Sequence, residues 1–269
     1  MRIAMAQMKM SESVTENLTQ TVAYMRQAKN SGADIVFFPE LQLSPFFPKY
    51  ERKNAERYLL TLDSKEIKTI RRVCNVLGIW ASPNLYLSLG GRRYDASLMI
   101  NASGEIVGIS KMVHIYQAEY FYEQDYYAPS DDGFKVYDTP FGKIGVVICF
   151  DRHIPESIRS CAVQGAELII IPTANLITED ATLFEWEIRA EAFHNLSYIA
   201  MCNRVGKEDG VEFCGESLIA APDGKLLLKS DNKAKLITFD IDLPRVQAER
   251  THRSWLELYG RTGDAPNSQ

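Results

Sequence analysis

Apolar runs alternate with amphipathic segments along the whole chain, and no linker or low-complexity stretch interrupts them. Apolar residues at consecutive positions predict buried strands, whereas apolar residues three and four positions apart predict helices. We therefore expect strands at residues 2–6, 34–38, 79–87, 96–101, 105–110, 135–137, 143–149, 168–171, 197–203, 216–221, 226–229 and 236–240. Helices are expected at residues 13–31, 64–77, 155–164 and 181–195.

The number of strands and their apolar character predict the fold class. Several expected strands are apolar at consecutive positions, as in residues 36–38 and 168–171, which is typical of strands covered on both faces. About a dozen strands are more than one open sheet usually holds, so two sheets between outer helix layers are favoured. We predict an α/β fold in which residues 1–269 form a single domain.

Composition argues against several classes of protein. Apolar residues make up 46% of the chain and the net charge is −5, which gives no sign of a nucleic-acid-binding surface. The apolar runs are too short for a signal peptide or a membrane span. The five cysteines include no C-x-x-C pair and the four histidines are scattered, so neither a disulfide framework nor a metal site is expected. These features favour a cytoplasmic protein.

Three ionisable residues lie at or just after the ends of apolar strands: Glu40, Lys111 and Cys149. Ligand crevices form at the carboxyl ends of strands in α/β folds, so we expect these side chains to share one crevice. A thiol can act as a nucleophile, a buried carboxylate can be its general base, and a fixed ammonium can stabilise an oxyanion. The backbone N–H of Phe150 is a second candidate donor to that oxyanion, and no cofactor is required.

Each of these three residues also has an ordinary structural interpretation. A cysteine that ends an apolar run is often a small buried hydrophobe. A glutamate or a lysine after a strand is often a solvated charge. Taken alone, the pattern leaves both the catalytic and the structural interpretation open.

Longer motifs around these residues resemble the nitrilase superfamily of carbon–nitrogen hydrolases. Three of them occur in the order expected for that family, namely FFPE at 37–40, SKMVH at 110–114 and VICFDRHIPE at 147–156. Further similar segments are GAEL at 165–168, NRVG at 203–206 and FCGES at 213–217. The resemblance therefore extends over nearly the whole chain.

The resemblance implies a four-layer α-β-β-α sandwich and a Glu-Lys-Cys triad formed by Glu40, Lys111 and Cys149. It also implies a second glutamate that holds the lysine and helps to position the hydrolytic water. Glu123 fits the family pattern better than Glu119 and is the predicted residue. The implied activity is hydrolysis of a small linear amide or N-carbamoyl compound through a cysteine thioester, without a cofactor or a metal ion.

The segment after Cys149 resembles the N-carbamoyl amino acid amidohydrolases, in which an arginine follows the nucleophile. Arg152 is therefore the predicted clamp for a substrate carboxylate, because a guanidinium can hold a carboxylate with two hydrogen bonds. Phe150, His153 and Asn175 are further predicted substrate-binding residues. The alternative for Arg152 is a salt bridge with Asp151 or Glu156 outside the pocket.

Other functions remain open at the level of the sequence. The aromatic run at 121–127 is also similar to N-carbamoylputrescine amidases, which take a cationic substrate. An ω-amidase, an aliphatic amidase or a nitrilase of the same superfamily is a further alternative. Outside the hydrolases, the chain could be an N-acyltransferase or a catalytically silent binding protein.

The C-terminal tail at 243–269 contains the apolar side chains of Trp255, Leu258 and Tyr259. Exposed apolar side chains favour association between copies of a chain. We therefore predict that this tail lies at a subunit interface of a homodimer or a higher homo-oligomer.

Overall fold

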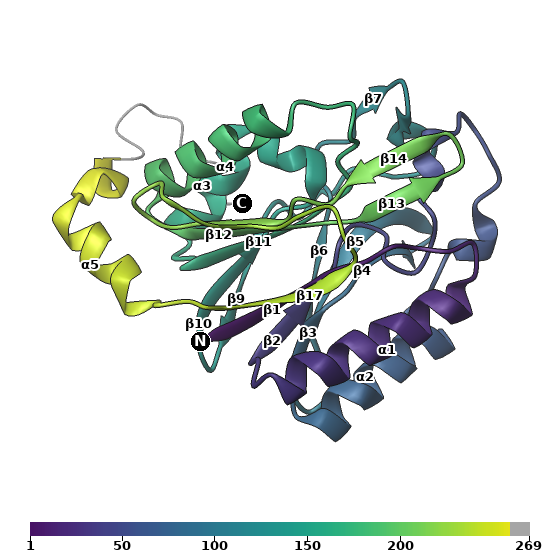
Figure 1. Ribbon diagram of the computed structural model, residues 1–269, viewed down its shortest axis with the longest axis horizontal. Helices are drawn as coiled ribbons and strands as arrows, with labels where there is room; N and C mark the ends of the chain where they lie inside the picture. The colour runs from purple at the N-terminus through teal and green to yellow at the C-terminus, as the bar shows by residue number, and fades with distance from the viewer. Residues whose placement is uncertain (259–269) are drawn as a thin grey trace.

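Two β-sheets pack face to face in the computed structural model, which describes residues 1–258, and helices cover both outer faces (Figure 1). The strands of the first sheet are β1 (Arg2–Gln7), β2 (Ile35–Phe37), β3 (Trp80–Ser82), β4 (Asn84–Leu89), β5 (Arg92–Ile100), β6 (Ile106–Lys111) and β17 (Lys235–Asp240). Those of the second are β9 (Lys135–Thr139), β10 (Gly142–Val146), β11 (Leu168–Thr173), β12 (Tyr198–Asn203), β15 (Leu218–Ala220) and β16 (Leu226–Lys229). This architecture is the predicted four-layer α-β-β-α sandwich.

The outer layers consist of two pairs of helices. The first sheet is covered by α1 (Val14–Asn30) and α2 (Lys65–Leu77), and the second by α3 (Pro155–Val163) and α4 (Ala181–Asn195) (Figure 1). Two short hairpins, β7 (Gln117–Ala118) with β8 (Phe121–Tyr122) and β13 (Val205–Glu208) with β14 (Val211–Cys214), extend beyond the sheets. The chain continues after β17 with α5 (Pro244–His252) and the 3-10 turn η5 (Ser254–Leu258).

Strand alternation distributes the apolar side chains between the layers. On β1, Ile3 and Met5 belong to the core between the two sheets, while Ala4 and Ala6 belong to the core under α1 and α2. Successive side chains of a strand point to opposite faces, so a strand covered on both faces must be apolar at every position. The continuous apolar runs of the sequence follow from this arrangement.

The helix ends show the expected capping chemistry. The Ser13 side chain accepts a hydrogen bond from the backbone N–H of Glu16 at the start of α1. At the end of α2, Gly78 takes the left-handed conformation, with φ at 60°, in which a side chain would be strained. The predicted helix boundaries are therefore correct to within one residue at these ends.

Some predicted boundaries are wrong. The single strand expected at 79–87 is two strands, β3 and β4, which are separated at Pro83, where the proline has no N–H for the ladder. The strand expected at 143–149 ends at Val146, and Cys149 begins the 3-10 turn η4 (Cys149–His153) instead. The β13–β14 hairpin and α5 were not predicted.

The described part of the C-terminal tail packs on its own chain. Val246 of α5 is fully buried in the core between the sheets, and the Arg250 guanidinium donates to the carbonyl oxygen of Ala166 at 2.5 Å. The Trp255 ring contacts the Phe193 ring edge-on, with their centroids 5.0 Å apart. These residues therefore have an intramolecular position, while Tyr259 lies outside the described residues and the subunit interface remains a prediction.

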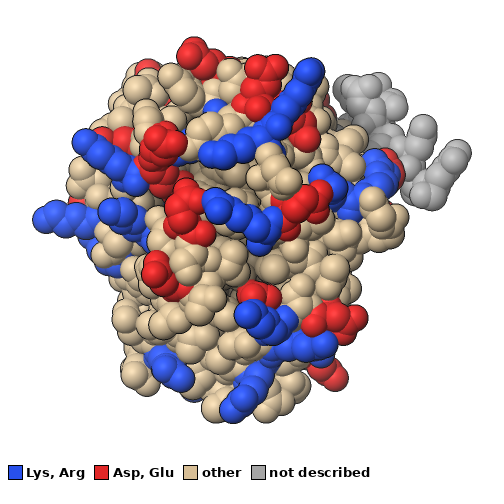
Figure 2. Space-filling model, turned by 90° about the vertical axis from the view of Figure 1, so that its right-hand side faces the viewer, with Lys and Arg blue, Asp and Glu red and all other residues tan. Residues whose placement is uncertain are grey.

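The surface carries charges of both signs. Figure 2 shows lysine and arginine side chains beside aspartate and glutamate on one face, without an extended area of a single sign. Within residues 1–258, no helix is long and apolar enough to cross a membrane.

Candidate active site

Cys149 lies at the turn that follows β10, in an unusual backbone conformation. Its φ angle is 40°, in the left-handed region that costs free energy for a residue with a side chain, and such strain concentrates at functional sites. The side chain is 5% exposed and borders a cavity of about 150 Å³. The residues that line this cavity are Tyr116, Phe121, Glu123, Cys149, Phe150, Arg152, His153, Ala174, Asn175, Glu179 and Phe184.

The neighbouring parallel strand supplies a hydroxyl to the cysteine. β10 and β11 pair in parallel, with Val146 opposite Ile170, so the residues after β10 lie next to the carboxyl end of β11. Thr173 is the last residue of β11, and its Oγ1 is 3.2 Å from the Cys149 Sγ. The site thus forms where two parallel strands end, as expected for this class of fold.

Three buried carboxyl groups belong to this site: Glu40 and Glu123, whose charges act on the Cys149 thiol, and Asp95, which lies beside Glu40. Glu40 and Asp95 are fully buried and Glu123 is 1% exposed. Glu40 interacts with both Asp95 and Cys149, and one oxygen each of Asp95 and Glu123 has no hydrogen-bond partner within the described chain. An unpaired buried carboxylate is costly, so these carboxyl groups have a strong tendency to hold protons.

The pKa values reflect this burial. Loss of hydration raises the pKa of Glu40 to about 7, and the nearby charge of Glu123 adds to the rise. Burial and the Glu40 charge raise the pKa of the Cys149 thiol well above its ordinary range, while Arg152 opposes this rise. The resting site therefore holds a neutral thiol beside a carboxyl group that titrates near neutral pH.

The two candidates for the second glutamate occupy different environments. Glu123 begins the 3-10 turn η3 (Glu123–Asp125), lines the cavity, and accepts a hydrogen bond from the backbone N–H of Tyr116 at 3.2 Å. Glu119 is exposed. Only the predicted residue of this pair, Glu123, is therefore positioned to act in the cavity.

Lys111 does not lie where we expected it. Its ammonium group forms a 2.9 Å salt bridge with Asp132 and lies over the Tyr94 ring, 4.7 Å from the ring centroid. Lys111 is paired with Ala96 across the β5–β6 ladder, and Ala96 belongs to the core under the helices. Its side chain therefore points to the outer face of the sheet, and the predicted proximity of Lys111 to the thiol is wrong.

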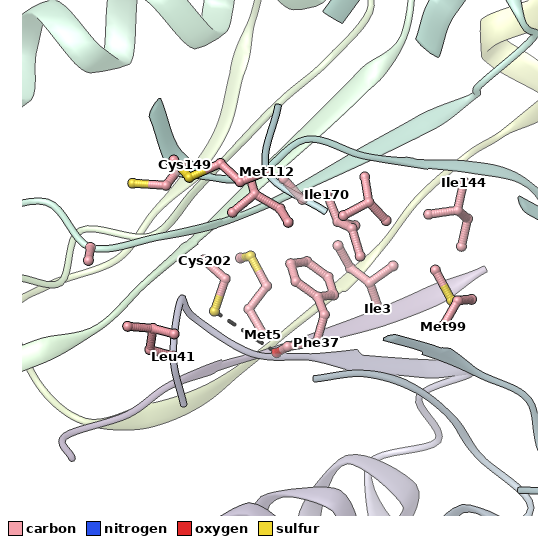
Figure 3. Packing of buried hydrophobic residues seen from close by; sticks show 14 of the residues in the cluster. Ile3, Met5, Phe37, Leu41, Met99, Met112, Ile144, Cys149, Ile170 and Cys202 are labelled. Atoms are coloured by element: carbon pink, nitrogen blue, oxygen red, sulfur yellow. Dashed lines mark hydrogen bonds between the residues drawn. The ribbon is translucent and has the colours of Figure 1, made fainter. Parts of the chain in front are cut away.

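The side chain that reaches the inner face of the first sheet is that of the next residue, Met112. It is fully buried in the core between the sheets, in the same cluster as Cys149, and Figure 3 shows the two side chains in that cluster. Because side chains alternate along a strand, a shift of one residue decides which face a side chain reaches. The expected lysine position between the sheets is thus occupied by an uncharged side chain.

Arg152 is the cation that contacts the thiol among the described residues. Its side chain is 2% exposed. One terminal nitrogen, Nη1, donates to the Cys149 carbonyl oxygen at 3.0 Å and to Thr173 Oγ1 at 2.9 Å, and lies 3.8 Å from the Cys149 sulfur. The other, Nη2, donates to Asn175 Oδ1 at 2.8 Å, and Nε lies 3.4 Å from a Glu187 oxygen. The alternative of a salt bridge outside the pocket is therefore also wrong.

The other predicted substrate-binding residues all border the cavity. Phe150 stacks on Tyr116 with the ring centroids 4.3 Å apart. His153 Nδ1 lies 2.6 Å from a Glu187 oxygen, and Asn175 accepts a hydrogen bond from Arg152. Phe150, His153 and Asn175 thus form walls of the cavity, while their contacts with a substrate remain a prediction.

Sequence reasoning missed several residues that shape this site. Thr173 ends a strand, so the reasoning that identified Cys149 could also have found it. Asp151 accepts hydrogen bonds from the backbone N–H groups of Val113 and His114, which ties the segment after β6 to the cysteine turn. Glu187 lies in the middle of α4, where no sequence signal separates it from a solvated glutamate.

Within residues 1–258, no cluster of three or more His, Cys, Asp or Glu side chains could hold a metal ion.

Comparison with known proteins identifies the family. The profile described as "Carbon-nitrogen hydrolase" matches residues 2–251. The chain belongs to this family. An N-carbamoylputrescine amidase from Arabidopsis thaliana is 28% identical, over 94% of this chain and 89% of the relative. A citrullinase from Francisella tularensis is 27% identical, over 93% and 91%.

A solved structure shows the same fold. The carbon-nitrogen hydrolase from Helicobacter pylori G27 superposes with a TM-score of 0.89 and 24% sequence identity, and the match covers 98% of this chain and 96% of that one. The family assignment confirms the predicted class of enzyme, an amidohydrolase that acts on carbon–nitrogen bonds.

Proposed function

We propose that this carbon-nitrogen hydrolase cleaves a small linear amide or N-carbamoyl compound, with Cys149 as nucleophile and Glu40 as general base. The observation that carries the proposal is the strained turn that presents the Cys149 thiol to a cavity, close to a carboxyl group with a pKa of about 7. A general base is most effective when its pKa lies near the working pH. The cavity volume of about 150 Å³ suits a small substrate.

The proposed reaction has two halves. The thiol proton passes to the Glu40 carboxylate while a sulfur lone pair attacks the carbonyl carbon, and the carbonyl π electrons move to oxygen. The tetrahedral intermediate then expels the amine, which takes the proton from Glu40, and a thioester remains on Cys149. Water, activated with the help of Glu40 and positioned by Glu123, adds to the thioester and releases the acid and the thiol. The Phe150 N–H is the proposed backbone donor to the oxyanion.

The pH dependence follows from the role of Glu40. Only its carboxylate form can accept the thiol proton, so kcat/KM should rise with pH and level off above the Glu40 pKa of about 7. The measurement is kcat/KM from about pH 5 to 9, where free enzyme and free substrate set the profile. A profile without an acidic limb in this range would exclude Glu40 as the base, provided that thermal unfolding shows an intact fold throughout.

We further propose an N-carbamoyl amino acid as the preferred substrate, with Arg152 contacting its carboxylate. A guanidinium has five N–H groups. Three of those of Arg152 are donated to Cys149, Thr173 and Asn175, and Nε faces Glu187. One Nη2 hydrogen is therefore left for a substrate, which supports a single charge-assisted contact instead of the expected bidentate clamp.

A cationic N-carbamoyl compound is the second candidate. Two glutamates, Glu123 and Glu179, line the cavity, and Arg152 is largely occupied by protein partners. An ammonium group would gain from these carboxylates, since opposite charges within about 4–6 Å favour the ionised forms. The Arabidopsis relative is named for N-carbamoylputrescine, a compound of this kind.

A substrate panel distinguishes the two candidates. We expect ammonia release to be fastest with N-carbamoyl amino acids, and slower with N-carbamoylputrescine, ω-amides and simple nitriles. A missing charge partner in a buried site typically costs about 1–3 kcal/mol, so kcat/KM should differ by about 5- to 150-fold. If N-carbamoylputrescine is the best substrate, the second candidate is correct. A panel without any turnover would contradict the proposed hydrolase activity itself.

A further inference from the structure

We infer that Arg152, and not Lys111, is the cation of the reaction centre, where it stabilises the negative charge on the Cys149 sulfur. This inference rests on the proposed nucleophilic role of Cys149. It assigns to Arg152 a part in the chemical step in addition to any contact with a substrate carboxylate.

The side chain of Lys111 has its partners away from the Cys149 thiol. It points to the outer face of the first sheet, where its ammonium group pairs with Asp132 and lies over Tyr94. Lys135 shares the same carboxylate, with its nitrogen 3.2 Å from Asp132. Since adjacent strand residues face opposite sides, no change of rotamer at position 111 brings its ammonium group between the sheets. The inner position belongs to Met112, which carries no charge.

Arg152 is held rigidly against the nucleophile. It reaches Cys149 through the carbonyl oxygen and lies 3.8 Å from the sulfur, and it donates to the Thr173 hydroxyl that is itself 3.2 Å from that sulfur. The guanidinium also lies over the Phe184 ring, 4.7 Å from the centroid. A buried arginine with this many partners loses little freedom when charge develops beside it, so it meets the requirement for a preorganised stabiliser.

A cation is needed at this site because the thiolate forms close to acidic side chains. When the thiol loses its proton to Glu40, the S–H bond breaks and its electron pair stays on sulfur, next to the acidic groups of Glu40 and Glu123. Both carboxyl groups raise the pKa of Cys149, and the charge of Arg152 lowers it. One opposite charge within about 4–6 Å shifts a pKa by about 1–3 units. Loss of Arg152 should therefore reduce the thiolate population by about 10- to 1,000-fold.

The rate at which iodoacetamide alkylates Cys149 tests this inference without any substrate. The thiolate is the reacting form, so the rate follows its population. Modification of the Cys149 peptide would be quantified by mass spectrometry from about pH 6 to 10 in the unaltered protein and in the variants Arg152→Met, Arg152→Lys, Lys111→Met and Lys135→Met. The peptide-level reading keeps the other four cysteines out of the signal, and thermal unfolding checks that each variant is folded.

We expect Arg152→Met to slow alkylation by about 10- to 1,000-fold at each pH below the thiol pKa. Arg152→Lys, which keeps the charge but not the planar fork, should recover part of the rate. Lys111→Met should match Lys135→Met, because both substitutions remove a cationic partner of Asp132. A slow Lys111→Met protein beside a normal Lys135→Met protein would overturn the inference, as would equal rates in Arg152→Met and the unaltered protein.

These outcomes are separate from those of the proposed function. If the substrate panel gives no turnover but the alkylation rates follow Arg152, the inference stands and the hydrolase proposal fails. If Arg152→Met does not fold, a normal alkylation rate in Lys111→Met and a reduced rate in Arg152→Lys support the inference. Equal rates in Arg152→Lys and the unaltered protein, together with a slow Lys111→Met protein, refute it.

Discussion

Replacement of Cys149 by alanine is expected to lower kcat by about four orders of magnitude or more, since removal of a nucleophile eliminates the covalent route. The fold should survive, because Cys149 is a small side chain at the wall of a cavity. Steady-state ammonia release from the best substrate of the panel is the measurement. Cys149→Ser should be almost as inactive, because a hydroxyl is a much poorer nucleophile here than a thiol.

Cys202 offers a matched control for this substitution. It is fully buried in the same cluster between the sheets, where Figure 3 shows it below Cys149, but it does not line the cavity. Cys202→Ala should keep kcat within a few-fold of the unaltered enzyme, although loss of a buried group should lower its stability by about 1 kcal/mol. Comparable turnover in Cys149→Ala and Cys202→Ala would mean that Cys149 is not the nucleophile.

Glu40→Gln is expected to lower kcat by about 100- to 10,000-fold, the range that general acid–base catalysis contributes. Glutamine matches glutamate in size, and it removes the ionisable carboxyl group from a fully buried position. The loss should therefore come from the missing proton transfer, and the acidic limb of the pH profile near 7 should disappear with it.

Glu66→Gln is the control for the charge change alone, because Glu66 is a buried glutamate on α2 and is not among the residues of the cavity. It should leave kcat and the pH profile unchanged. An acidic limb that persists in the residual activity of Glu40→Gln would assign the titration near pH 7 to another group and would remove Glu40 from the role of base.

Local patterns were sufficient to predict most of the fold. The continuous apolar run of β1 and the glycine after α2 are each visible within a few residues of sequence, so the corresponding elements are correct to within one or two residues. The position of Cys149 after an apolar strand follows from the same signals, because strand ends in this class of fold lead to the ligand crevice.

Features that depend on tertiary contacts could not be predicted in this way. The motif around Lys111 gave the correct strand but the wrong side chain for the site, since the face that a residue reaches changes with every position along the strand. The partners of Arg152 lie more than 20 residues away at Thr173 and Asn175, and on α4 at Glu187. Patterns of neighbouring residues in the sequence carry no information about contacts between residues that are so far apart.

The most direct test of the central claim is the mass of the Cys149 peptide from enzyme that is quenched in acid during turnover. We expect an adduct on Cys149 equal to the acyl or carbamoyl part of the substrate. Hydroxylamine should remove an acyl group as the hydroxamate and a carbamoyl group as hydroxyurea. Glu123→Gln, which should slow the attack of water, should increase the fraction that carries this adduct. Full turnover with Cys149 always unmodified, and with neither hydroxamate nor hydroxyurea formed when hydroxylamine is present, would contradict a covalent thiol mechanism at this residue.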